Sequence, residues 1–591
     1  MPSAGTSSNG TIRRALSWRW SPLAAIALAL ALTAPSLTIG LVADDWIQVL
    51  VGRGQQSRLP GLPKSSLDLF SFAGHSVGGN VTARDSGLYP WWTDLDVKLA
   101  FFRPLASLTH SIDWRLWPQS PFLMHLHNLV WFALALAAVA LFYRRFCLDP
   151  AVAGLATLLY ALDDAHGQAV GWIANRNALV ALACALPVLV VHDRWRRDGW
   201  RTGAWLAPAI FAVALCAGEA SLAVVGYLAA HALWLDRGRL VERLVRLWPY
   251  FVVIVIWRIV YNHLGYGTAN SGVYIDIGHD PRAFLTALPS RFVFLLAGQL
   301  ALPWSDLAAM WSYIGPRALK IAFVIAFTSS AFVVAQLIPI ARRDPTMRFL
   351  ATGALLALVP VCSTFPADRL LWFVGIGAMG LVAQFLLTPP RGWWAWSGFV
   401  VLLLLHVVLA PPELALRSRS MEAVNIPLVR ADESLPMTPD TAGRTVVLVN
   451  PPADFFAGYL GFRRAAFGEP RPTFRWLAST QESVAVTRED EHTLRVTPHG
   501  GFMAQISEYM LRSRPLPDHA HIDLPGMHVD VLGSTADGRP ASARFRFDLP
   551  LDDPSLYFAR WDVQRYAPFK LPAIGETVTL PPADFLTAMH K

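Results

Sequence analysis

Long apolar segments separated by short polar ones dominate the chain up to about residue 410. The first apolar run, from Leu23 to Val42, is about long enough to cross a bilayer as a helix. Further runs of the same kind follow, and we predict that each also crosses the membrane. They are 121–143, 151–162, 178–191, 204–217, 221–235, 248–261, 321–340, 349–361, 370–387 and 394–409.

One further apolar segment, 284–303, is interrupted by Pro289, Arg291 and Gln299. If it crossed the membrane, the basic residues Arg342, Arg343 and Arg348 would lie outside. If it is re-entrant or interfacial, every basic cluster stays in the cytoplasm, as basic loops usually do. We therefore predict that 284–303 does not span. The chain then has about 11 transmembrane helices, a cytoplasmic N-terminal tail (1–22) and an outward loop (43–120).

The character of the sequence changes after residue 410. Charged and turn-forming residues separate short β-like runs, such as Thr445 to Val449, Ser483 to Val486 and Ala543 to Phe547. We predict that 411–591 is a mostly β soluble domain with one helix near Phe502 to Leu511. The fold class is thus a polytopic α-helical membrane protein (23–410) with a β-rich domain on the periplasmic or extracellular side.

Composition agrees with this class. Hydrophobic residues make up 54% of the 591 residues, charged residues only 16%, and the mean hydropathy is +0.38. The net charge of +8 does not indicate nucleic acid, because the basic residues cluster at the ends of apolar runs, where they set topology and meet anionic lipid. The four cysteines have no metal-like spacing and are typical of small buried hydrophobes.

The first apolar run ends in Asp44, Asp45 and Trp46. An acidic pair at a membrane helix end is costly unless it lies in water or a polar cavity, so the pair is either a solvated helix end or a functional site. The predicted topology places further polar residues on the same side: Arg103, His125, Asn128, Asp163, Asp164, His166, Arg176, Glu219, Asp368 and Arg369.

This set of side chains suits the transfer of a sugar from a lipid phosphate. A carboxylate takes the proton of the acceptor hydroxyl, and arginines hold the phosphate while charge develops on it. Each residue also has a structural interpretation. Arg103 and Arg369 can extend to lipid head groups, His125 can be a packed core residue, and the 163–166 segment can be a loop or part of a metal site with too few ligands.

Several short motifs resemble the GT-C superfamily of polyprenyl-phosphate-sugar-dependent glycosyltransferases, in particular the protein O-mannosyltransferase group that includes the tetratricopeptide-containing transmembrane enzymes. The acidic pair Asp44-Asp45 resembles that family's acidic pair in the first outward loop. The family's Tyr/Phe-Arg-Pro-Leu motif resembles residues 102–105, and its His-x-x-Asn motif resembles residues 125–128. Its Lys-Glu element resembles Gly218-Glu219 without the lysine, and its Glu-Arg-Tyr-Leu element resembles residues 368–371.

Residues 163–176 are similar to the family stretch His-Pro-x-His-x-Glu-x-Val-x-Trp-Ile-x-Gly-Arg. The chain departs from it at Asp163, Asp164, Gln168 and Asn175, where the family has His, Pro, Glu and Gly. No tetratricopeptide pattern follows. The resemblance implies a GT-C-like fold, with Asp44 or Asp45 as general base and Arg103, Arg176 or Arg369 holding the departing phosphate. It adds Gln168 to the substrate-binding candidates.

The resulting hypothesis is an inverting glycosyltransferase of the cell (inner) membrane. Its partners are a polyprenyl-phosphate sugar donor, membrane lipids and an extracytoplasmic acceptor, which is a protein, a lipid or a glycan. No cofactor is required by the sequence, although a divalent cation can sit beside paired carboxylates. Two alternatives stay open: a non-catalytic transporter or scaffold for envelope glycans, and a GT-C fold that has lost its activity.

Overall fold

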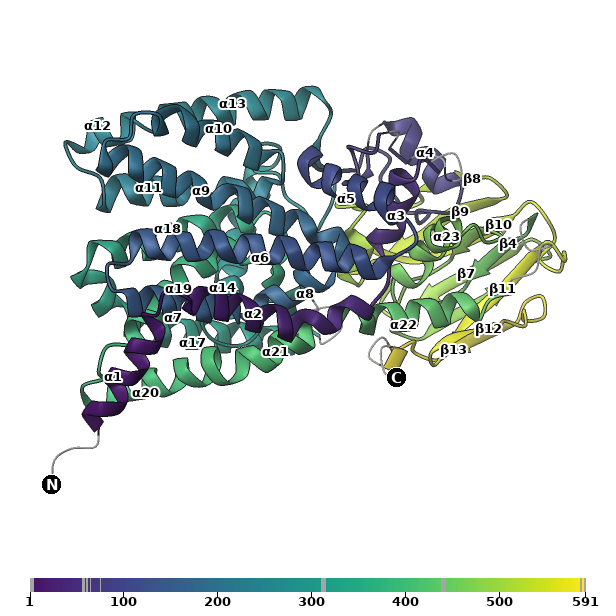
Figure 1. The fold of residues 1–591 in the computed structure, drawn as a ribbon. Helices are drawn as coiled ribbons and strands as arrows, with labels where there is room; N and C mark the ends of the chain where they lie inside the picture. Colours follow the sequence, from purple (N-terminus) through teal and green to yellow (C-terminus); the bar gives the residue numbers. More distant parts are fainter. Residues whose placement is uncertain are drawn as a thin grey trace.

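The computed structural model describes residues 5–55, 59, 62–63, 65–74, 76–309, 315–436, 443–584 and 587–588. Figure 1 shows a bundle of long helices with a β-rich region packed against one of its ends. We call this the domain end of the bundle. The first helix, α1 (Gly5–Leu16), lies at the opposite end (Figure 1). This architecture confirms the predicted fold class of a polytopic helical membrane protein with a β-rich C-terminal region.

In the part of the chain that the structure describes, seven helical segments are long and apolar enough to cross a membrane. They are Ser21–Thr38 (α2 with η1), Pro121–Phe146 (α6), Ile173–Asp198 (η4 with α9), Leu240–His263 (α12 with α13), Pro281–Leu300 (α14), Pro316–Arg343 (α17) and Gly392–Glu433 (α20 to α22). Shorter apolar helices complete the bundle: Pro150–Ala161 (α7), Gly203–Leu215 (α10), Val224–Trp234 (α11), Pro345–Val361 (α18) and Trp372–Leu386 (α19).

Small residues let these helices approach closely. At Gly377 of α19, an added Cβ would lie 2.2 Å from the Leu350 carbonyl oxygen of α18. The hydroxyl of Tyr227, on α11, donates to the Phe373 carbonyl and accepts from the Gly377 amide. In lipid, helices associate through such close packing and inter-helix hydrogen bonds, because burying apolar surface adds little there. These contacts therefore fix α11, α18 and α19 as one unit.

Helix α14 (Pro281–Leu300) has the length of a spanning helix, yet it contacts the domain end along its course. Arg291 donates to the carbonyl of Cys362, directly after α18. Gln299 donates to Asp163, directly after α7, and Ser305 beyond the helix donates to Asp368. The other end of α7 lies next to Asp149, which pairs with Arg13 of α1. The middle of α14 and its C-terminal end therefore contact the domain side of the bundle, and the prediction that 284–303 does not span stays a prediction.

The loop predicted at 43–120 is ordered into short elements. They are α3 (Asp44–Gly52), β1 (Ser71–Ala73), α4 (Val77–Asp85), β2 (Lys98–Ala100) and α5 (Pro104–Leu116), and β3 (Gly267–Ala269) completes a three-stranded sheet in the order β1-β2-β3. Trp91 and Trp92 of this loop donate to the carbonyls of Leu477 and Glu508 in the β-rich region. The loop and the β-rich region therefore share one hydrophobic core.

The β-rich region contains two sheets. The six-stranded antiparallel sheet has the order β13-β6-β7-β10-β9-β8, and the four-stranded sheet has the order β12-β11-β4-β5 with β4 parallel to both neighbours. The strands are β4 (Thr445–Leu448), β5 (Thr473–Trp476), β6 (Val484–Arg488), β7 (Thr493–Pro498), β8 (His521–Leu524), β9 (Met527–Ser534), β10 (Pro540–Phe547), β11 (Leu556–Asp562), β12 (Arg565–Pro568) and β13 (Thr577–Leu580). The three predicted β-like runs coincide with β4, β6 and β10.

The helical content near the domain boundary differs from the predictions. After α20 (Gly392–Leu403), the helix continues through a π-helical turn, η7 (Leu404–Leu409), into α21 (Ala410–Arg417) and α22 (Ser420–Glu433). Near Phe502 to Leu511 the chain forms only a short 3-10 turn, η9 (Ile506–Tyr509), and the domain's long helix is α23 (Phe455–Phe467). The apolar and glycine-rich sequence of α23 has no clear helical period, because one of its faces packs on the sheet and another on α3.

Candidate active site

The acidic pair begins α3, and its two members have different environments. Asp45 is 1% exposed. Its Oδ2 accepts a hydrogen bond from the Val42 amide (2.8 Å), and its Oδ1 accepts one from the Ala174 amide of η4 (Ile173–Asn175) (2.7 Å). Burial raises the pKa of Asp45 to about 8 against these two donors. Asp45 therefore joins the start of α3 to η4 and has both oxygens occupied.

Asp44 is half-buried, and its Oδ1 accepts a hydrogen bond from the hydroxyl of Tyr459 on α23 (2.5 Å). Within the described residues, its Oδ2 has no hydrogen-bond partner. Burial raises the pKa of Asp44, while the Tyr459 hydrogen bond and the positive charge of Arg369 act in the opposite direction. Asp44 is thus the member of the pair that retains a free oxygen, and the β-rich region supplies its phenol partner.

Arg369 supplies the positive charge that acts on Asp44. It lies in η6 (Asp368–Leu370), and its guanidinium stacks over the rings of Trp172 and Phe365, at 5.1 and 5.7 Å from their centroids. Across the described part of the chain, no carboxylate forms an ion pair with it. A guanidinium held flat by aromatic rings, with its N–H groups unpaired, is suited to bind two oxygens of a phosphate.

Arg103 is the second cation of this region. Its Nε donates to Glu219 (2.8 Å), and its guanidinium lies 4.6 Å from the Phe101 ring centroid. Glu219 begins η5 (Glu219–Ala223) and also accepts a hydrogen bond from Tyr261 of α13 (3.4 Å). Glu219, at the break between α10 and α11, thus forms an ion pair with Arg103. This ion pair largely neutralises the charge of Arg103.

Tyr274 lies between the two arginines, because its ring contacts Phe101, under Arg103, and Phe365, under Arg369, with ring centroids 5.5 and 6.3 Å apart. Burial raises the pKa of the Tyr274 phenol, and the charges of Arg369, Asp44 and Arg103 all act on it. Neither Tyr274 nor Tyr459 is a sequence-predicted site residue. Both come from segments without a recognisable motif, and no local signal in the sequence indicates them.

His125, Asn128 and Arg176 form a buried layer beneath the acidic pair. Arg176 is 0% exposed; it pairs with Asp113 (2.6 Å) and donates to the Asn128 side chain (2.5 Å). The Asn128 amide in turn donates to the Trp172 carbonyl (3.2 Å), and Nε2 of His125 lies 2.9 Å from the Gly40 carbonyl. These side chains hold backbone segments on either side of Asp44 and Asp45 in place. Asp113, which has no motif, completes the layer.

A second polar cluster surrounds Arg417 of α21. Its guanidinium pairs with Asp164 (3.0 Å), Asp306 (3.1 Å) and Asp368. Burial, with repulsion among the acids, raises the pKa of Asp164 to about 8 and that of Asp306 to about 7. Asp163, whose pKa burial raises to about 6, accepts from Gln299 instead. Arg417 thus supplies the positive charge that balances this group of carboxylates.

The remaining predicted residues of this stretch pack against the bundle. The His166 ring stacks on Trp372, with centroids 4.0 Å apart, and burial lowers its pKa to about 3. Gln168 points its amide at the sulfur of Met421 on α22 (3.6 Å). Of the predicted site residues, the structure therefore groups Asp44, Arg369 and Arg103 together. The others form hydrogen bonds, ion pairs or packing contacts in the layers around these three.

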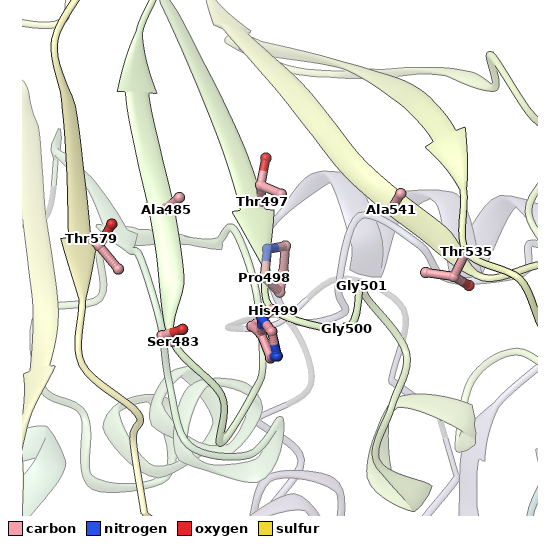
Figure 2. A pocket seen from close by; sticks show the side chains of 10 residues that line it. All are labelled: Ser483, Ala485, Thr497, Pro498, His499, Gly500, Gly501, Thr535, Ala541 and Thr579. Atoms are coloured by element: carbon pink, nitrogen blue, oxygen red, sulfur yellow. The ribbon is translucent and has the colours of Figure 1, made fainter.

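A pocket of about 400 Å³ lies elsewhere, on the outward face of the six-stranded sheet. Figure 2 shows Thr579, Ala485 and Thr497 on adjacent strands along it, with His499, Gly500 and Gly501 in the turn at its lower end. Among the described residues that line this pocket, none is acidic, arginine or lysine, so it offers neither a carboxylate base nor a fixed cation for a phosphate; His499 is its one titratable side chain.

The sequence matches no protein-family model, and no curated protein matches it. The structure has some similarity to ArnT from Cupriavidus metallidurans bound to undecaprenyl phosphate, with a TM-score of 0.36 and 15% identity over 76% of this chain and 85% of that chain. It is also similar to the archaeal oligosaccharyltransferase AglB from Archaeoglobus fulgidus in complex with an inhibitory peptide and a dolichol-phosphate. The TM-score is 0.40 and the identity 12%, over 77% of this chain and 64% of that chain.

Proposed function

We propose that the chain is a membrane glycosyltransferase that moves a sugar from a polyprenyl-phosphate donor to a hydroxyl of an extracytoplasmic acceptor, with inversion at the anomeric carbon. The observation that carries the proposal is the combination of Asp44 and Arg369 at the domain end of an apolar bundle. Within the described residues, Asp44 has an oxygen without a hydrogen-bond partner and Arg369 has no ion-pair partner, and the charge of Arg369 acts on Asp44. A base, a phosphate-binding cation and access for a lipid tail are the three requirements of such a transfer. The ordered motifs that resemble the GT-C superfamily support the same assignment.

In the proposed reaction, Asp44 accepts the proton of the acceptor hydroxyl. The hydroxyl oxygen forms a bond to the anomeric carbon of the donor from the face opposite the phosphate. The bond between that carbon and the phosphate oxygen breaks, and the electron pair leaves with the polyprenyl phosphate. Arg369 compensates the additional negative charge on the leaving phosphate, which is where a fixed cation lowers the barrier.

The other predicted residues have supporting roles in this proposal. Arg103 borders the phosphate site but shares its charge with Glu219. Arg176 positions the segment before η4 through Asp113 and Asn128, rather than contacting the donor. Asp45 fixes the start of α3 through its two backbone hydrogen bonds and so positions its neighbour Asp44.

The proposed location is the cell inner membrane, with the domain end outward. Basic side chains gather at the opposite end of the bundle, where Arg145 pairs with Asp193 and Arg196 pairs with Asp236. Basic termini of apolar helices usually remain in the cytoplasm. With α14 kept on the domain side, the tail 1–22 is cytoplasmic, the membrane domain extends over 23–410, and the β-rich domain (411–591) faces the periplasm or exterior.

The test uses the purified full chain in lipid vesicles with synthetic polyprenyl-phosphate hexoses, and the readout is released polyprenyl phosphate. We expect Asp44→Asn to release it about 10²- to 10⁴-fold more slowly than the wild type, the usual contribution of a general base. The matched control is Glu482→Gln, which removes an exposed acid of the β-rich region. Equal rates for Asp44→Asn and wild type would refute the assignment of the base.

Asp45→Asn tests whether Asp45 stabilises the fold, in contrast to the catalytic role proposed for Asp44. The substitution places an amide N–H₂ against one of two buried backbone donors, and leaving one unsatisfied costs about 1–3 kcal/mol of stability. We expect a lower unfolding temperature in this variant and the wild-type temperature in Asp44→Asn, whose new amide can still bond the Tyr459 hydroxyl. If no donor lipid is consumed by any form of the protein, a transport or scaffold role takes the place of the enzyme.

A further inference from the structure

A cluster of histidine and aspartate side chains lies on the solvent-facing side of the six-stranded sheet, at its edge strand β8. Figure 1 shows β8 beside β9 in the β-rich region. The register pairs His521 of β8 with Asp530 of β9, and Asp523 of β8 with His528 of β9. Since alternate residues of a strand face opposite sides, all four side chains share one face. Their neighbours Leu524, Val529 and Val531 are buried on the other face.

We propose that His521, Asp523 and His528 bind a divalent transition-metal ion of the zinc class. The three residues offer ligand atoms that all lie within 4.8 Å of one another. Asp523 Oδ1 is central, at 2.9 Å from Nε2 of His521 and 2.6 Å from Nδ1 of His528. Small side-chain rotations on a fixed backbone bring such a set around one ion.

The second nitrogen of each ring has its own carboxylate. Nδ1 of His521 lies 2.6 Å from Asp530, and Nε2 of His528 lies 3.1 Å from Asp548. Histidines that bind metals commonly donate the other ring N–H to a carboxylate, which fixes the tautomer and the ring orientation. Here both rings have that arrangement, with their inner nitrogens directed at the same aspartate.

The donor set selects the kind of ion. Imidazole nitrogens suit Zn²⁺, Cu²⁺ and Ni²⁺, whereas Mg²⁺ and Ca²⁺ prefer sites made of oxygen alone. Two histidines and one aspartate leave at least one coordination position for water or an external ligand. Without an ion, the same residues form only exposed ion pairs, which contribute little to stability because solvent screens them. With an ion, they link the edge strand β8 to β9, a connection independent of the transfer reaction.

Metal binding to the full chain in detergent tests the proposal. After removal of metals with a chelator, the protein is titrated with Zn²⁺ against a chromophoric competitor. We expect one strong site in the wild type and its loss in His521→Ala and in His528→Ala. His499→Ala, which removes an exposed histidine of the same sheet, should bind as the wild type does. The variants are compared by elution volume and unfolding temperature.

Asp530→Asn keeps every proposed ligand and should weaken binding about 10- to 100-fold, as losses of such carboxylate partners do. If an alanine variant fails to fold, the affinity of Asp530→Asn for Zn²⁺ still tests the proposal. Co²⁺ should give visible absorption without a thiolate band, which excludes the cysteines as ligands. The proposal is overturned if the wild type has no strong site, or if the His521→Ala and Asp530→Asn variants bind Zn²⁺ as tightly as it does.

Discussion

The hydrogen bond from Tyr459 to Asp44 couples the β-rich region to the chemistry of the proposed site. A phenol that donates to a carboxylate stabilises the ionised form, and a hydrogen bond to a charged group contributes about 1.5–3 kcal/mol. Tyr459→Phe removes the hydroxyl and retains the edge contact of the ring with Trp46. The pKa of Asp44, already raised by burial, should therefore rise further.

Only the ionised Asp44 can accept the acceptor's proton, so a higher pKa of Asp44 lowers the transfer rate at acid pH. As the pH falls, Tyr459→Phe should lose transfer activity at a higher pH than the wild type does. On the acid side its rate should be about 10- to 100-fold lower, the factor that corresponds to the lost hydrogen bond. On the alkaline side, where both forms are ionised, the two rates should agree.

The assay is release of polyprenyl phosphate across a pH series, with Tyr557→Phe, a change on β11 remote from Asp44, as control. If the acid limb of Tyr459→Phe coincides with that of the wild type, Asp44 is not the group whose ionisation limits the rate. A uniform loss at every pH would instead mean that Tyr459 acts by holding α3 and α23 together.

Two further substitutions separate binding from folding. Arg369→Gln should weaken retention of polyprenyl phosphate in a vesicle-binding assay and slow transfer, with partial recovery in Arg369→Lys, because lysine restores charge without the planar fork; unchanged retention would contradict the phosphate role. Arg176→Gln should lower the free energy of unfolding by about 3–5 kcal/mol, because it leaves Asp113 buried without its cation. A stable but inactive Arg176→Gln variant would contradict the structural role.

The sequence predicts those features that depend on local physical requirements. A helix in lipid must be apolar along its length, so the runs that became α2, α6 and α17 are visible in the hydropathy pattern alone. The acidic pair stands out for the same reason, since charges next to such a run need a polar environment. Arg369 and Arg103 were identifiable because each lies in a short motif with a fixed spacing.

The features that the sequence did not predict depend on contacts between distant segments. Tyr459 meets Asp44 across 415 positions of sequence, and Arg417 meets Asp164 across 253. The last helix was predicted to end at Leu409, because polar and charged residues follow from Pro411 and Pro412 onward. The π-helical turn before them leaves these prolines in the first turn of α21, so the helix continues and brings Arg417 to the acids.

Lipid-linked sugars in cells provide the most direct test of the central claim, that Asp44 drives transfer from a polyprenyl-phosphate donor. Cells producing the wild type, Asp44→Asn or Glu482→Gln at equal protein levels are compared by mass spectrometry of polyprenyl-phosphate sugars and envelope glycans. The account predicts that Asp44→Asn alone accumulates one lipid-linked sugar and loses the matching glycan residue, which also names the sugar. Unchanged pools in Asp44→Asn, with altered pools after deletion of the whole chain, would contradict it.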